Sequence, residues 1–96
     1  MPPIVRLGDV STGHGCFPSR PNDSASPNVF ANGIPVHRVG DHWETHCCGP
    51  ACHDGEEATG SPNVFANNLP VARIGDSVNC GDFDGEGSPN VFANGG

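Results

Sequence analysis

Three side chains of the kind that bind transition metals stand at matching places in the sequence. His14 and His46 each come five residues after the aspartate of a Gly-Asp pair, and Cys80 comes four residues after the aspartate of a third pair. If the three segments that contain them surround a common axis, the two imidazoles and the thiol converge on it. Neutral imidazole and thiolate are ligands that zinc prefers in proteins.

A tetrahedral zinc ion needs a fourth ligand, and the long loop after the second Gly-Asp pair supplies His53, seven residues after His46. The set His14, His46, His53 and Cys80 would fill the coordination sphere and leave no position for a catalytic water. Closed sites of that kind are structural. We therefore expect one structural zinc ion, with iron as the alternative metal, that holds the loop ends together as an apex.

Other ligand sets remain open. They use Cys47, Cys48 or Cys52 in place of Cys80 or His53, with Cys48 as the foremost alternative thiolate, and the segment HCCGPACH alone resembles a local zinc knuckle. In a third interpretation the cysteines and histidines are ordinary loop residues or form a local disulfide. The chain has five cysteines, and this odd number, with one vicinal pair, fits poorly with the disulfide framework of a secreted protein.

The segments that carry these ligands follow a threefold internal repeat. The octapeptide SPNVFANG or SPNVFANN occurs at residues 26–33, 61–68 and 88–95, and residues 26–41 align without a gap on residues 61–76. The opening segment, PIVRLGD at residues 3–9, matches the second half of this unit, so the termini cut one unit in two. We expect a single domain over residues 1–96, with repeats at 26–41, 61–76, and 88–96 joined with 1–9.

Each repeat reads as a short β-hairpin. A Val-Phe-Ala run is followed by Asn-Gly or Asn-Asn and then by an apolar-rich run, and Asn-Gly favours the positive φ angles of a two-residue type I′ turn. Helix is not expected, because 14 glycines and 10 prolines interrupt the 96-residue chain and no stretch shows a helical period. The prolines at positions 35 and 70 belong at strand edges. The sequence therefore predicts an all-β, pseudo-threefold domain of three short hairpins.

Several single positions carry further expectations. One phenylalanine recurs at the same position in each octapeptide: Phe30, Phe65 and Phe92. We expect these rings to form the shared core. Trp43 has no counterpart, so it either fills the centre of the array or lies exposed beside the second loop. His37 and His42 stand where the second copy has alanine and serine, and both are expected at the surface.

Charged residues follow the repeat as well. An arginine stands three residues before the aspartate of each Gly-Asp pair: Arg6, Arg38 and Arg73. A recurrent Arg-Xaa-Gly-Asp predicts a structural salt link or turn clamp rather than a binding site. The acidic stretches at residues 54–57 and 82–86 are expected to be solvated loop tips.

Charge and size exclude several functional classes. A net charge of −7 with only four basic residues leaves no basic patch for phosphates, so nucleic acid is not an expected partner. The N-terminus lacks the features of a signal peptide, and we expect synthesis in the cytoplasm. A zinc hydrolase would need an open coordination position beside a base such as Asp54, Glu56 or Glu57. The closed ligand set and the small chain argue against an enzyme and against a small-molecule substrate.

The chain resembles the proline-alanine-alanine-arginine (PAAR) repeat proteins, which cap the spike of contractile injection machines. Residues 70–73 (PVAR) come closest to the naming motif, and residues 35–38 (PVHR) and 3–6 (PIVR) depart from it at one or both alanine positions. The resemblance implies a cone whose base sits on a trimeric β-helical spike, one chain per trimer, and whose vertex is held by zinc with histidine and cysteine ligands. Such a tip would complete the spike and touch the target cell envelope transiently during membrane piercing.

Two settings fit this resemblance. One is the baseplate hub of a contractile phage tail, which we favour because the chain stops directly after its third repeat and carries no effector. The alternative is the spike tip of a type VI secretion system, where such proteins also serve as effector adaptors. A free-standing small zinc-binding protein or zinc enzyme is a remote alternative. The sequence assigns no partner-binding residue.

Overall fold

The computed structural model describes residues 1–93, and within them the chain forms strands and turns but no helix. The strands pair as three separate antiparallel hairpins. Their bounds are β1 (Phe30–Ala31), β2 (Ile34–Pro35), β3 (His42–Cys48), β4 (Ala51–Glu56), β5 (Phe65–Ala66) and β6 (Leu69–Pro70). The all-β architecture predicted from the sequence is confirmed. None of the described residues belongs to a helix that could cross a membrane.

The turns of the repeat hairpins have the predicted geometry. In β1–β2 the two central residues, Asn32 and Gly33, have φ angles of 57° and 74°, and in β5–β6 the corresponding Asn67 and Asn68 have 56° and 67°. Two positive φ values are the signature of the type I′ turn, whose twist matches that of the flanking strands. The third turn, expected at Asn94, lies outside the described residues.

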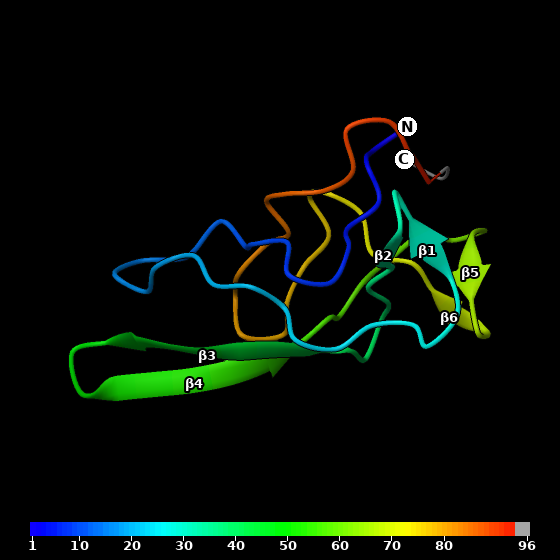
Figure 1. Cartoon of the computed structure of the whole chain (residues 1–96). Coiled ribbons are helices and arrows are strands. Elements are labelled where there is room, and N and C mark those ends of the chain that lie inside the picture. Colours follow the sequence, from blue (N-terminus) through cyan, green and yellow to red (C-terminus); the bar gives the residue numbers. More distant parts are fainter. Residues whose placement is uncertain (94–96) are drawn as a thin grey trace.

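The two chain ends complete the third unit. Phe92 pairs with Pro3 in an antiparallel bridge, just as Phe30 pairs with Pro35 and Phe65 with Pro70. Figure 1 shows the N-terminus and the last described residues beside the short hairpins, at the end of the molecule opposite the tip of β3–β4. The N-terminal segment therefore supplies the missing second half of the last repeat.

Backbone hydrogen bonds close the three units into a ring. Val5 N donates to Ala72 O at 3.0 Å, Ala72 N donates to His37 O at 2.9 Å, and His37 N donates to Val5 O at 3.0 Å. A second set of equivalent bonds surrounds the first: Leu7 N to Pro35 O, Val39 N to Pro70 O, and Ile74 N to Pro3 O. In both sets, each unit donates one backbone hydrogen bond to a neighbouring unit. These main-chain bonds fix the pseudo-threefold arrangement.

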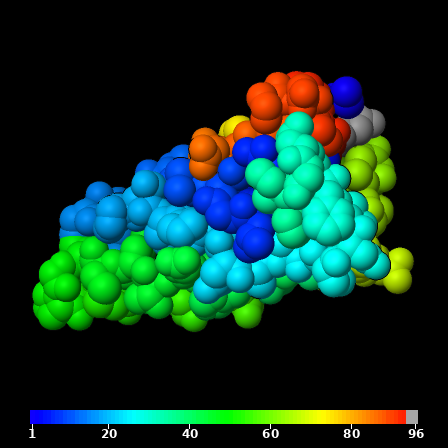
Figure 2. Space-filling model, viewed as in Figure 1, coloured from blue at the N-terminus to red at the C-terminus, as the bar shows by residue number. Residues whose placement is uncertain are grey.

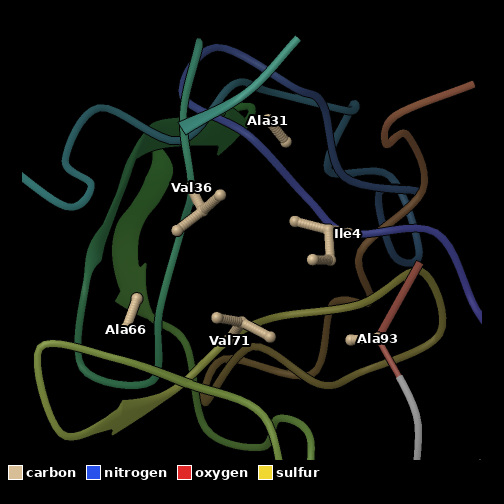
Figure 3. Packing of buried hydrophobic residues seen from close by; sticks show 6 residues of the cluster. All are labelled: Ile4, Ala31, Val36, Ala66, Val71 and Ala93. Carbon is tan, nitrogen blue, oxygen red and sulfur yellow. The ribbon is translucent and has the colours of Figure 1, made fainter. Parts of the chain in front are cut away.

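The apolar core is small and made of aliphatic side chains. It contains one larger residue and one alanine from each unit, which point toward a common centre in Figure 3: Ile4, Val36, Val71, Ala31, Ala66 and Ala93. The expectation that the phenylalanines form the core is wrong, since Phe30, Phe65 and Phe92 are 56%, 54% and 46% exposed. Adjacent residues of a strand face opposite sides of it. The space around the axis is narrow, so the alanine that follows each phenylalanine points inward and the phenylalanine ring points outward.

The arginine clamps are confirmed. Arg Nε lies 2.9–3.0 Å from the aspartate Oδ2 in all three Arg-Xaa-Gly-Asp segments, and the same oxygen accepts the backbone N–H of the arginine: Arg6–Asp9, Arg38–Asp41 and Arg73–Asp76. The intervening glycine has a φ of 87–93°, which a residue with a side chain rarely adopts. Each clamp therefore closes the same tight turn at the end of its unit.

The segment after the second Gly-Asp pair is a hairpin rather than the long loop expected. Strands β3 and β4 pair from His42–Glu56 to Cys48–Ala51, with an irregularity between Trp43 and His46. Figure 1 shows this hairpin running away from the short ones, and Figure 2 shows that the molecule is broader at the end with the short hairpins and the N-terminus. Hairpin β3–β4 therefore forms the narrow end of the domain, which we call the tip.

Above the apolar core, the axis is filled by polar and aromatic side chains. Trp43 is fully buried and contacts the ring of His37 edge-on, which excludes the exposed alternative for Trp43. His37 is buried at the layer of Val5 and Ala72, so the prediction of a surface position for His37 is wrong. Glu57, Asp82 and Asp84 are buried as well, which overturns the prediction of solvated loop tips for these residues. With so few apolar residues in the chain, the loops fold inward and complete the interior with polar groups.

Candidate metal centre

Four side chains predicted as metal ligands meet at the base of the tip. His46 on β3 and His53 on β4 are directly paired across the hairpin, His14 comes from the first loop, and Cys80 comes from the loop after the third Gly-Asp pair. One ligand atom from each lies within 4.8 Å of all the others. The repeat alignment therefore located a real convergence of side chains.

The spacing of the ligand atoms matches a tetrahedral site. The three Nε2 atoms of His14, His46 and His53 are 2.8–3.2 Å apart, and Cys80 Sγ is 3.8 Å from His14 Nε2. Bond lengths of about 2.0 Å to nitrogen and about 2.3 Å to sulfur give tetrahedron edges of about 3.3 Å and about 3.5 Å. The nitrogens are slightly closer together and the sulfur slightly farther away than in that tetrahedron, so the group is close to the size of a zinc site.

The tautomer of His46 also suits a metal ligand. Its Nδ1 lies 2.7 Å from the carbonyl oxygen of Pro18 and donates to it, because a carbonyl can only accept. The lone pair is then on Nε2, which faces the other two imidazoles and also accepts a hydrogen bond from Arg20 Nη1 at 2.8 Å. If the Nε2 atoms of all three rings are unprotonated, as metal ligation requires, their lone pairs repel one another unless a cation lies between them. The donor set therefore fits a bound metal.

Aromatic packing holds the histidines in place and shields them partly from solvent. The ring of Phe17 stacks on His53 with centroids 4.2 Å apart and on His14 with centroids 4.8 Å apart, and the two imidazoles stack on each other. Loss of solvation, followed by the nearby His46 and His14, lowers the pKa of His53. A lowered pKa keeps the imidazole neutral, as metal ligation requires.

Arg20 links the thiol to the rest of the interior. This buried side chain places Nη2 3.4 Å from Cys80 Sγ and Nη1 2.8 Å from Asp82 Oδ2, and its guanidinium lies 5.6 Å from the centre of the Trp43 ring. Nη1 is also 2.8 Å from His46 Nε2. A guanidinium in this position donates a hydrogen bond to the sulfur of Cys80 and fixes its direction.

Asp82 balances the charge of Arg20 in the interior. Burial acts to raise the pKa of Asp82, but hydrogen bonds from Ser11, the Phe83 backbone and Thr12 lower it below its usual value. The carboxylate therefore stays ionised opposite the guanidinium. Sequence reasoning missed Arg20, Asp82 and Phe17; the one available signal was that Arg20, alone among the four arginines, lies outside the repeated position.

The other four cysteines are paired in the structure. Disulfides join Cys16 to Cys48 and Cys47 to Cys52, and Cys80 is free. Cys48, the alternative thiolate, is therefore used to tie the first loop to the end of β3. The second disulfide crosses β3–β4 next to the His46–His53 pair. Both bonds hold together the segments that carry three of the four candidate ligands.

Comparison with known families agrees with this geometry. The model of the PAAR motif family matches residues 8–83, which is well over half of the chain and includes all four candidate ligands. No curated protein sequence matches the chain. The chain belongs to the PAAR-repeat spike-tip family.

Proposed function

We propose that this protein is the tip of the central spike of a contractile injection machine, where one chain caps the blunt end of a trimeric β-helical spike protein. The observation that carries the proposal is the closed ring of three equivalent units within one chain. A single chain can match a threefold-symmetric partner only if it presents three similar surfaces itself. The function is common to the spikes of contractile phage tails, which we favour, and of type VI secretion systems.

The surface that would meet the spike is the broad end of the domain. Each unit exposes its phenylalanine there, and Val29 and Leu69 are also more than a third exposed. Exposed aromatic side chains in equivalent positions are typical of interface anchors. Strands β1, β2, β5 and β6 are only two residues long and lie in two-stranded sheets. Their open edges would continue the β-structure of the spike.

The opposite end would act as the piercing point. We propose that His14, His46, His53 and Cys80 bind one structural zinc ion, with iron as the alternative metal. Zinc supplies a fourfold crosslink between loops that are far apart in the sequence, and a structural site of this kind contributes on the order of 10 kcal/mol to folding. The Cys16–Cys48 and Cys47–Cys52 bonds add covalent links beyond it. The role is mechanical rather than catalytic.

Removal of the three repeat phenylalanines tests the capping surface. The triple variant Phe30→Ser, Phe65→Ser, Phe92→Ser should fold, because these rings are about half exposed, but should bind the purified trimeric spike protein of the same genome at least about 100-fold more weakly. Native mass spectrometry of the wild-type complex should give one chain per three spike chains. The matched control is Phe83→Ser, which removes a ring that is 50% exposed but lies outside the repeat, and which should bind normally. Equal binding by the triple variant would exclude this face as the interface.

A further inference from the structure

Each of the three units places one polar side chain at the same level of the axis, below the metal centre. The three residues are equivalent because the backbone N–H of each donates to the carbonyl of its own Gly-Asp aspartate: Asn22 to Asp9, Glu57 to Asp41, and Asp84 to Asp76. Their side chains are only 2%, 2% and 1% exposed. Two of the three positions in this buried layer therefore hold carboxyl groups.

The carboxyl groups are incompletely satisfied. Asn22 donates to Arg6 O at 2.9 Å and accepts from Gly8 N, and Glu57 Oε1 accepts from Trp43 Nε1 at 3.0 Å. Within residues 1–93, however, Glu57 Oε2 and both side-chain oxygens of Asp84 have no hydrogen-bond partner. His37 Nε2, beside Glu57, is also buried without a hydrogen-bond partner. A buried carboxylate without a donor is strongly unfavourable, so at least one proton is missing from this arrangement.

The two carboxyl groups face each other. Carboxylate oxygens of Glu57, Asp76 and Asp84 lie within 4.8 Å of one another. Asp76 is neutralised by Arg73 at 3.0 Å, which leaves Glu57 and Asp84 as the uncompensated pair. Two ionised carboxylates this close and this deeply buried cannot coexist without a counter-charge.

We propose that Asp84 is protonated in the folded chain and donates a hydrogen bond to Glu57 Oε2, so that the two carboxyl groups share one proton and carry one negative charge. The donor Trp43 Nε1 then faces that charge on the other oxygen of Glu57, and His37 Nε2 lies 3.2 Å from the same oxygen. The shared proton satisfies Glu57 Oε2 and one of the two Asp84 oxygens, and it removes one of the two buried charges. It is a second axial link that does not depend on the proposed zinc.

The charged surroundings agree with this assignment. Burial, followed by the charge of Glu57, raises the pKa of Asp84 from its ordinary value of 3.8 to about 11, and the Asp76 and Asp82 carboxylates act in the same direction. The two arginines nearest to the cluster each form an ion pair with another carboxylate: Arg73 with Asp76, and Arg20 with Asp82. Both guanidinium groups are thus already committed to other carboxylates, and neither is placed to neutralise Asp84.

A metal ion is a poorer occupant than a proton. Calcium takes six to eight oxygen ligands and magnesium retains several waters. The cluster offers three oxygens without a partner, while Asp76 Oδ1 already accepts from Thr59 and both of its oxygens accept from Arg73. A proton needs no coordination shell and fits the closed, buried layer.

The stability of the domain should depend on this proton in a definite direction. Because the pKa of Asp84 is higher in the folded than in the unfolded chain, the proton stabilises the fold fully below pH 3.8, and the benefit declines as the pH rises toward 11. Asparagine carries an N–H donor in place of the acidic O–H. Asp84→Asn should therefore raise the melting temperature by at least about 4 °C near neutral pH, and by more at about pH 9.

The experiment compares wild type, Asp84→Asn and Glu44→Gln, a matched control that removes an exposed acid on β3. The zinc-loaded wild type should show a protonated-carboxyl infrared band at neutral pH, which Glu44→Gln retains and Asp84→Asn loses without losing metal. Absence of the band in wild type, or an Asp84→Asn variant less stable than wild type at neutral pH, would overturn the proposal. A rise in melting temperature on adding calcium, seen in wild type but not in Asp84→Asn, would assign the layer to a cation instead. If the variant does not fold, the wild-type spectrum still decides.

Discussion

Replacing Cys80 with alanine is expected to lower the zinc content that survives dialysis against a chelator and to lower the melting temperature by at least about 10 °C. The substitution leaves three imidazoles and an open coordination position in place of a closed site. A structural zinc contributes on the order of 10 kcal/mol, and a domain of this size loses about 4–8 °C per kcal/mol. Elemental analysis and calorimetry on the same sample would measure both effects.

The control for this variant removes thiols that are not assigned as ligands. The double variant Cys47→Ser, Cys52→Ser deletes one disulfide and should be less stable, but it should still contain one zinc per chain. If Cys80→Ala retained its zinc through this dialysis as well as wild type does, Cys80 would not be a ligand. Cys48, released from its disulfide with Cys16, would then be the thiolate to test next.

Replacing Arg20 with methionine is expected to destabilise the domain by about 3–5 kcal/mol, because the buried Asp82 carboxylate loses its only ion-pair partner among the described residues. The same change should weaken zinc affinity by about 10–100-fold, as is usual when a group that orients a metal ligand is removed. Denaturant unfolding and competition with a zinc-binding dye would measure the two losses separately.

Two further variants separate charge balance from general disruption. Adding Asp82→Asn to Arg20→Met should restore part of the stability, because the uncompensated charge is gone, while zinc affinity stays low. Arg6→Met breaks a clamp of the repeat far from the ligands, and should reduce stability without changing zinc affinity. Wild-type affinity in Arg20→Met would show that this arginine has no role in orienting Cys80.

The repeat itself made a large part of this structure predictable. Equivalent positions in a closed array must meet near its axis, so the spacing from each Gly-Asp pair was enough to bring His14, His46 and Cys80 together. Features that depend only on residues close together in the sequence were also predictable. The Asn-Gly turns demand positive φ, and the arginine clamps form between residues only three apart.

Other features depend on how much room for side chains there is around the pseudo-threefold axis. The sequence of the repeats does not reveal that room. A strand of two residues presents one side chain inward and one outward, and only the width of the axis selects Ala31 over Phe30. Burial of Glu57 and Asp84 follows from the same shortage of apolar side chains. The irregular hairpin β3–β4 has no counterpart in the other units, so comparison of the repeats could not predict its strands or its disulfides.

The most direct test of the metal-pinned tip is elemental analysis of the purified protein, together with its melting temperature before and after treatment with a strong chelator. We expect one zinc ion per chain and a large fall in melting temperature when the chelator removes it. A protein that contains no metal, and whose melting temperature does not change with chelator, would contradict the account.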